Sequence, residues 1–265
     1  MRQFLPCVLA SLCLMTAGVC PVTPLDGTQM TLQAQSTDAA AEITSAILTE
    51  TQQVLERRAQ RMGLTQVSVA IVGSNQLQVQ LAGDMDVEQV SRVLTTKAHL
   101  SFQTQMPGTE ADLTALRFHQ MELLSSNPDS TLLEENRGAI EALFEPSGLT
   151  GAQVEGAVAQ PNAYGSATVQ VDFDDLGAEQ FTEITRQLAG TGQSLGIFLD
   201  GQLLSSPTVD VAYAETGITG GSAVISGILS LEAAQELAIQ LQSQALPVAV
   251  EMIAVETVML TPECD

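Results

Sequence analysis

The spacing of apolar residues changes its period along the first hundred residues. Residues 28–35 alternate between apolar and polar side chains, which predicts a short strand. Residues 39–62 carry apolar side chains at helical spacing, and Gly63 follows as a residue suited to end a helix. The periodic part of the chain therefore begins with a strand and a long amphipathic helix.

Two alternating runs, 67–72 and 76–81, flank a Gly-Ser-Asn turn and predict a β-hairpin. Residues 87–96 return to helical spacing, and residues 99–105 alternate again. The predicted order is strand, helix, strand, strand, helix, strand. This order is the ferredoxin-like split βαβ arrangement, with residues 99–105 as its last strand.

The next residues predict a helical hairpin. Helical spacing covers 110–124 and 132–144, and the residues between them are rich in Ser, Asn, Pro and Asp. A second module follows, with a strand at 168–173 and a helix at 179–188. Its remaining predicted elements are a hairpin of 195–199 and 202–204 around Asp200-Gly201, a strand at 223–225, a helix at 231–241 and a strand at 248–258.

The charge balance narrows the classes of partner. The 265 residues hold 31 acidic and 9 basic side chains, for a formal net charge of −22, and Lys97 is the single lysine. Such a surface repels nucleic-acid backbones and anionic lipid headgroups, so we expect no nucleic-acid partner. The apolar share of 45% indicates a folded chain and not an acidic disordered tail.

The residues that could carry catalysis or bind a metal are scattered. Three of the four cysteines lie in the first 20 residues, Cys264 is next to last, and His99 and His119 stand alone. No pair has metal-ligand spacing, and no nucleophile lies in a recognisable catalytic motif. We expect no metal, no cofactor and no enzymatic activity.

Two local patterns allow a ligand site but favour a structural role. Asp172, Asp174 and Asp175 could bind a metal, but their position between a strand and a helix is typical of a helix cap. Gly220-Gly221 could cradle an anion through main-chain N–H groups. No helix follows it directly and no lysine is near, so we expect a glycine turn into a strand.

Residues 1–24 predict a signal peptide or an N-terminal anchor. Arg2 precedes an apolar run over residues 4–15, and Thr16, Ala17 and Gly18 offer a cleavage site. Cys20 is a candidate lipidation site, although the bulky residue before it departs from the lipobox pattern. We expect an extracytoplasmic protein, soluble or anchored by its N-terminus, with membrane contact only through that segment.

Short motifs in the second half occur in a fixed order. They are Gly148-Leu149-Thr150-Gly151, Leu199-Asp200-Gly201 with Ser205-Ser206-Pro207, Ile218-Thr219-Gly220-Gly221, and Ala245-Leu246-Pro247. In this order they resemble the large extracytoplasmic domain of SecD. Leu25-Asp26-Gly27-Thr28-Gln29, and Arg58 with Met62-Gly63-Leu64, resemble two further motifs of that family.

The resemblance implies an α+β fold with a ferredoxin-like base subdomain and an inserted α+β head subdomain. The expected segments are 1–24 as the leader, 25–109 as the first part of the base, 110–147 as the helical hairpin, 148–227 as the head, 228–260 as the closing helix and strand of the base, and 261–265 as a tail. The chain departs from the family motifs at Gln60, Gln66 and Ala82, all in the base.

The resemblance also implies protein transport as the function. Secreted polypeptides and the Sec translocon are the expected partners, without proton coupling of the chain's own, because it ends where the membrane helices of the family begin. The candidate polypeptide-contact residues lie in the head motifs: Asp200, Gly201, Ser205, Pro207, Ile218, Thr219, Gly220 and Gly221. The alternative is a structural or regulatory envelope protein that uses the same fold to bind a folded partner.

The leader gives a first testable prediction. In cells that express the full sequence, we expect the protein in the extracytoplasmic fraction without its leader, because the basic residue and apolar run match a secretory signal. Fractionation followed by mass spectrometry of the N-terminus measures this. Uncut protein in the cytosol would contradict it.

Overall fold

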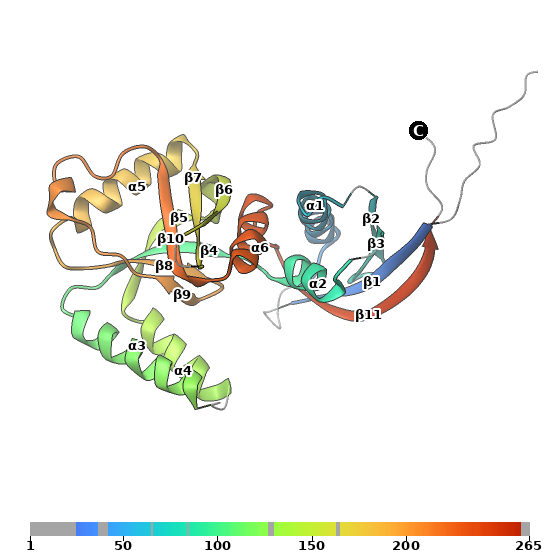
Figure 1. Ribbon diagram of the computed structural model, residues 1–265, viewed down its shortest axis with the longest axis horizontal. Coiled ribbons are helices and arrows are strands. Elements are labelled where there is room, and N and C mark those ends of the chain that lie inside the picture. Colours follow the sequence, from blue (N-terminus) through green and yellow to red (C-terminus); the bar gives the residue numbers. More distant parts are fainter. Residues whose placement is uncertain are drawn as a thin grey trace, which may run out of the picture.

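The protein is described here from a computed structural model, which covers residues 25–36, 42–64, 66–83, 85–126, 130–162 and 165–260. Two stretches addressed by the sequence lie outside these residues. They are the predicted leader 1–24 with Cys20, and the tail 261–265 with Cys264. The described residues form two hydrophobic cores joined by a few crossing segments (Figure 1).

The first core is a four-stranded sheet covered by two helices. Its strands lie in the order β11-β1-β3-β2, and all pairs are antiparallel. The bounds are β1 Leu25–Gln35, β2 Val67–Val72, β3 Gln76–Ala82 and β11 Ala249–Leu260, with helices α1 Ser45–Arg61 and α2 Val87–Thr95. Met30, Leu77 and Val79 on the strands pack against Leu55 and Leu94 on the helices. The ferredoxin-like arrangement is confirmed.

The predicted last strand of this sheet was wrong. Residues Leu100–Gln105 do form a strand, β4, but it pairs with two strands of the second core. The strand that pairs with β1 at this position is β11, which begins more than 140 residues after β4 ends. Alternation along β4 marked a strand correctly, but its period carries no information about which partner the strand pairs with.

The second core contains two sheets, with strand orders β5-β4-β8-β9 and β10-β7-β6. The bounds are β5 Phe144–Thr150, β6 Val154–Pro161, β7 Ala167–Phe173, β8 Leu195–Leu199, β9 Gln202–Ser205 and β10 Ser222–Leu229, with helices α5 Asp175–Leu188 and α6 Leu231–Gln242. The predicted hairpin of 195–199 and 202–204 is confirmed. Strands β5 and β6 were not predicted, because Pro146, Gly148 and Gly156 interrupt their alternation.

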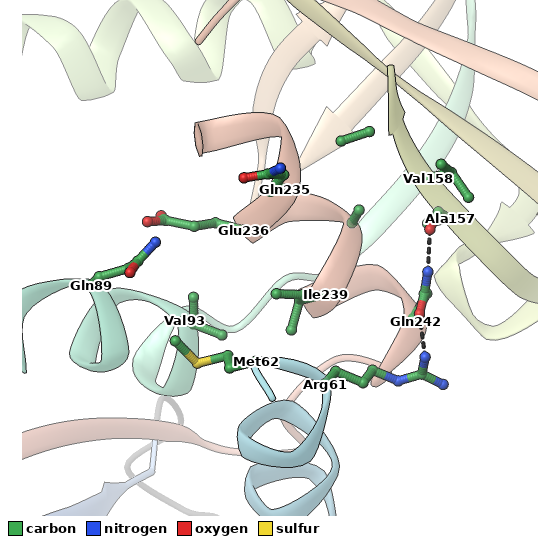
Figure 2. Close-up of a pocket in the computed structure, with 12 residues that line it drawn as sticks. Arg61, Met62, Gln89, Val93, Ala157, Val158, Gln235, Glu236, Ile239 and Gln242 are labelled. Atoms are coloured by element: carbon green, nitrogen blue, oxygen red, sulfur yellow. Dashed lines mark hydrogen bonds between the residues drawn. The ribbon is translucent and has the colours of Figure 1, made fainter. Parts of the chain in front are cut away.

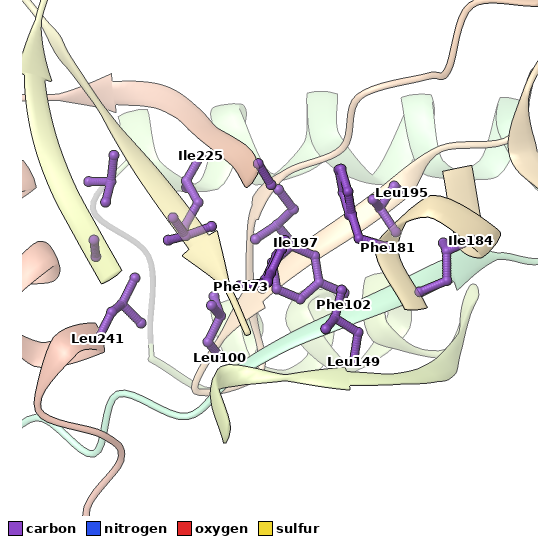
Figure 3. Close-up of a cluster of buried hydrophobic side chains, with 14 of the residues drawn as sticks. Leu100, Phe102, Leu149, Phe173, Phe181, Ile184, Leu195, Ile197, Ile225 and Leu241 are labelled. Atoms are coloured by element: carbon purple, nitrogen blue, oxygen red, sulfur yellow. The ribbon is translucent and has the colours of Figure 1, made fainter. Parts of the chain in front are cut away.

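Aromatic side chains link the two sheets of the second core (Figure 3). Phe102 on β4 meets Phe173 on β7 edge to face, with ring centroids 5.4 Å apart, and Phe173 lies 5.4 Å from Phe181 on α5. With only 3% aromatic residues in the chain, much of the remaining contact is made by Val, Leu and Ile. Three of the seven phenylalanines are therefore concentrated where the sheets and α5 meet.

The predicted helical hairpin is confirmed as α3 Glu110–Ser125 and α4 Ser130–Glu141. It extends away from the sheets in Figure 1. A small third hydrophobic cluster attaches the hairpin to the second core, where Leu113 and Ile140 pack on Phe144 and Phe198. Phe144 and Phe198 stack edge to face with centroids 5.1 Å apart.

Helix α6 lies between the two cores (Figure 1). Ser230 caps its first turn by accepting a hydrogen bond from Ala233 N, and Ala234, Leu237, Ala238 and Leu241 are buried in the second core. The sequence assigned this helix to the base, whereas its apolar face packs with the head strands. The division of the chain into the predicted segments stays a prediction.

Among the described residues, no helix is both long enough and apolar enough to cross a membrane.

Candidate functional site

One buried guanidinium holds the crossing between the two cores. Arg58, on α1, is 0% exposed and donates to main-chain carbonyl oxygens from two separate parts of the chain. At the end of α2 it reaches Val93 O at 2.9 Å and Leu94 O at 3.2 Å, and in the segment after α2 it reaches the carbonyls of Thr96 and Lys97. After α6 it reaches Gln244 O at 3.2 Å. Both connections between the cores are therefore tied to one side chain.

Burial disfavours the charged form of Arg58, whereas the nearby carboxylate and carbonyl groups favour it. Burial lowers the pKa of Arg58 to about 10, while the nearby Asp200 carboxylate acts in the opposite direction. The guanidinium is still protonated at neutral pH. Carbonyl dipoles and one carboxylate therefore replace most of the water that it loses, while Nε has no hydrogen-bond partner among the described residues.

Asp200, a predicted contact residue, sits at this crossing. It adopts a left-handed conformation with φ of 50°, and Gly201 follows with φ of 77°, as the tight β8–β9 turn requires. Its carboxylate accepts hydrogen bonds from Ala98 N at 3.1 Å and His99 N at 2.8 Å. The hairpin turn thus anchors the segment that enters the second core, a role that its turn signature alone did not reveal.

The remaining arginines of α1 and α2 hold α6 against the first core. Arg92 pairs with Glu236 at 2.9 Å and Glu232 at 3.4 Å, and Arg57 donates to Ser243 O at 3.3 Å. Arg61 donates to the side-chain oxygen of Gln242. Half of the chain's eight arginines therefore lie at this junction, in a protein with a net charge of −22.

A cavity of about 660 Å³ lies at the junction (Figure 2). Its walls come from the end of α1, from α2, from α6 and from strand β6. Gln242 crosses it, because its amide nitrogen donates to Ala157 O on β6 while its oxygen accepts from Arg61 (Figure 2). Val158, 53% exposed, lies beside this contact. No sequence motif indicated this cavity, since its walls come from four distant segments.

The glycine-rich motif lies elsewhere, against α5. Ile218 N donates to Thr185 Oγ1 at 2.8 Å, and Thr182 Oγ1 donates to Ile218 O at 3.1 Å. Gly221 accepts a hydrogen bond from Phe173 N at 2.8 Å and leads directly into β10. The expected glycine turn into a strand is confirmed, and Thr219 and Gly220 within it are exposed.

The other candidate residues have structural contacts as well. Ser205 Oγ lies 3.3 Å from Ser226 Oγ, and Pro207 O accepts from Leu195 N at 2.8 Å. The structure thus places the candidate residues in separate contacts, at the crossing, along β9 and against α5, and does not gather them into one site.

The acidic cluster acts as a cap. Asp174 precedes α5 and accepts from Gly177 N at 2.7 Å, while Asp172 accepts from the side-chain amide of Gln170 at 2.9 Å. Within the part of the chain that the structure describes, no group of His, Cys, Asp and Glu residues could hold a metal.

Comparison with known proteins decides the family. Residues 130–248 match the family model of the SecDF P1 head subdomain, and residues 48–107 match that of the N-terminal part of the SecDF P1 domain. The chain belongs to the SecD family.

Several SecD proteins are similar over most of this chain. The protein translocase subunit SecD of Synechocystis sp. is 37% identical over 89% of this chain and 54% of its own length. That of Prochlorococcus marinus is 30% identical over 88% of this chain and 56% of its own length. The chain therefore spans about half the length of the curated relatives it matches.

Solved SecDF structures share the fold. A structure titled "Structure and function of a membrane component SecDF that enhances protein export" superposes with a TM-score of 0.64 at 28% identity, covering 87% of this chain and all of that one. A crystal structure of SecDF in a super-membrane-facing form gives a TM-score of 0.68 at 27% identity, over 88% of this chain and 30% of that one. The predicted SecD resemblance and the α+β fold class are confirmed.

Arg58 gives a prediction about stability. Replacing Arg58 by Met leaves several buried carbonyls without a donor, so we expect the free energy of unfolding to fall by about 3 kcal/mol. Arg57→Met removes a partly exposed guanidinium and is the matched control, with an expected loss below about 1 kcal/mol. Urea unfolding followed by circular dichroism measures both. Equal losses would contradict the role assigned to Arg58.

Gly217, just before the ITGG motif, gives a second prediction. Its φ is +67°, and a Cβ there would lie 2.1 Å from Thr182 O, so we expect Gly217→Ala to destabilise the protein by about 3 kcal/mol. Gly73→Ala has a similar φ of +68° but meets nothing within 4 Å, so strain alone should cost it about 1 kcal/mol. Thermal unfolding of both variants separates the steric clash from the backbone strain. A Gly217→Ala variant no less stable than Gly73→Ala would refute the close packing of this loop on α5.

Proposed function

We propose that this chain is an extracytoplasmic binding module of protein export, which contacts translocating or unfolded polypeptide through its head. The observation that carries the proposal is the match of residues 130–248 to the SecDF P1 head subdomain. The relatives carry the name protein translocase subunit SecD, and one solved relative is described as a component that enhances protein export. The Sec translocon is the proposed partner of the assembled system.

Hollows on the head support binding of a polypeptide. Besides the junction cavity, a hollow of about 480 Å³ lies between α5 and strands β4 and β5. Pro146 and Ile184 line it together with Leu176, which is 56% exposed. Mixed apolar and polar walls of this kind suit an extended chain of variable sequence. The exposed motif residues Pro207, Thr219 and Gly220 stay the proposed contacts outside these hollows.

The proposed action is passive capture. A binder on the far side of a membrane biases a moving chain against backsliding by no more than its binding free energy. Millimolar to micromolar affinity corresponds to roughly 4–8 kcal/mol, which is enough to bias diffusion and weak enough to allow release. We propose that the chain supplies this binding step and no proton coupling of its own.

Site-specific photo-crosslinking tests the proposal. Crosslinkers at exposed head positions Gln202 and Thr208 should capture a reporter preprotein when the sample is irradiated during translocation. Irradiation after translocation has ended should give no such product. A crosslinker at Ala70, exposed on the outer strand of the base sheet, is the matched control and should give little product. Crosslinks from the head only to a folded envelope protein would refute polypeptide capture and favour a structural or regulatory role.

A further inference from the structure

Strand β6 forms one edge of the three-stranded sheet, so half of its main-chain groups do not face β7. Phe173 on β7 donates to Gly221, on the β10 side. Both groups of a strand residue point to the same side, and successive residues alternate, so Gln170 and Asp172 point toward β6. Gln170 is paired with Val158.

The same alternation sets the direction of the neighbouring β6 residues. Because Val158 directs its main-chain groups to β7, Ala157 and Ala159 direct theirs to the open edge. The position of Gln242 agrees, since its amide reaches Ala157 O from outside the sheet (Figure 2). Among the described residues, β6 has no strand paired on that side, so the main-chain N–H and C=O of Ala159 face the open edge.

Gln242 occupies the edge as an extended peptide would. Its side-chain amide supplies one donor to Ala157 O, the bond that a peptide N–H would make in a sheet. The junction cavity is lined by Ala157, Val158 and Ala159, so the open part of the edge faces free space. Ala157 is 1% exposed, so a strand reaches its carbonyl only by displacing Gln242, whereas Ala159 is half-buried and lines the cavity directly.

We propose that an extended polypeptide segment adds to β6 as a further strand, pairing with Ala159 and displacing Gln242 from Ala157. This inference rests on the proposed polypeptide-binding function and specifies how the chain is held. Addition to a sheet edge uses main-chain hydrogen bonds, which every sequence offers, and therefore suits a protein that meets many different chains.

The charges around the cavity agree with such an occupant. Its charged lining residues are Arg61 and Glu236, whose formal charges cancel, although the whole chain carries −22. A polypeptide segment of either charge therefore meets no net repulsion from the lining residues. Anionic or cationic small ligands, in contrast, find no excess of opposite charge there.

Strand addition would also release a link between the cores. Gln242 contacts Arg61 on α1 and Ala157 on β6 at once, so it joins the base helix to the head sheet. A peptide whose N–H donates to Ala157 O replaces the hydrogen bond from Gln242 to β6. Peptide binding and the Arg61–Gln242–Ala157 contact thus exclude each other.

A pair of peptides tests the main-chain pairing on the full-length protein. The probe is a fluorescent 12-residue peptide of alternating Thr and Val, kept dilute enough to stay monomeric, and its partner has alternate main-chain nitrogens methylated so that they cannot donate. By fluorescence anisotropy, we expect the unmethylated peptide to bind at least tenfold more tightly. It should also slow the amide exchange of Ala159.

Variants of the edge and of the link complete the test. Ala159→Pro removes the outward N–H without breaking a bond to β7 and should weaken peptide binding at least fivefold, while Ala159→Ser keeps the N–H and should not. Gln242→Leu removes the competing amide and should tighten binding severalfold. Circular dichroism checks the fold of each variant, and the peptide pair does not depend on any variant.

The outcomes separate this inference from the function on which it rests. Equal affinity of the two peptides, or protection of other amides but not of Ala159, would overturn strand addition and leave polypeptide binding in place. Absence of binding by either peptide would overturn both. Weaker binding by Gln242→Leu would overturn the competition between Gln242 and the peptide.

Discussion

The burial of one positive charge at the crossing of two chain segments is the constraint on which this architecture depends. Arg58 contributes the guanidinium, and five main-chain carbonyls around it come from the end of α2, the segment after it and the segment after α6. A buried guanidinium without partners would be very costly, so these segments must converge to satisfy it. Asp200 adds a carboxylate nearby and holds the entering segment through Ala98 and His99. The position of the second core relative to the first therefore depends on hydrogen bonds to main chain, which few side chains other than arginine can make in such number.

The rest of the junction is polar, in contrast to the two cores that it joins. Arg57, Arg61 and Arg92 reach α6 through exposed or half-exposed contacts, whereas each core is closed by aliphatic and aromatic packing. Exposed ion pairs contribute little each, so these contacts select an arrangement more than they stabilise the fold. Gln242, the partner of Arg61, also donates a hydrogen bond to Ala157 O on β6. Concentrating half of the arginines here leaves the remaining surface strongly acidic, which agrees with a partner other than nucleic acid or anionic lipid.

The surface proposed to bind polypeptide differs from the one that the head motifs indicated. The glycine-rich segment and the Asp200 turn both have structural roles. Thr182 and Thr185 hold the glycine-rich segment, and the Asp200 turn holds the segment that crosses into the second core. The open edge of β6 lies instead beside a cavity whose walls come from both cores. In this arrangement, residues that make the fold possible also position the surface proposed to bind polypeptide. Family membership and these hollows together support export as the setting of that binding.

Alternation and helical spacing by themselves determined the class of most elements, because local side-chain periodicity reports which face of a strand or helix is buried. They predicted the hairpin of β2 and β3, the helices α1 to α6 and the Asp174 cap, and short motifs in order identified the SecD resemblance. Tertiary structure decided which strands pair. Strand β4 pairs in the second core and not in the first sheet, where β11 pairs with β1 as the closing strand that the resemblance implied. Strands β5 and β6 lie where Pro and Gly interrupt the alternation. It also decided the roles of Arg58 and Gln242, since their partners lie far away in sequence and a charged or amide side chain shows no period of its own. Pairing partners and buried polar contacts depend on long-range packing, which no local pattern of hydrophobic and polar positions encodes.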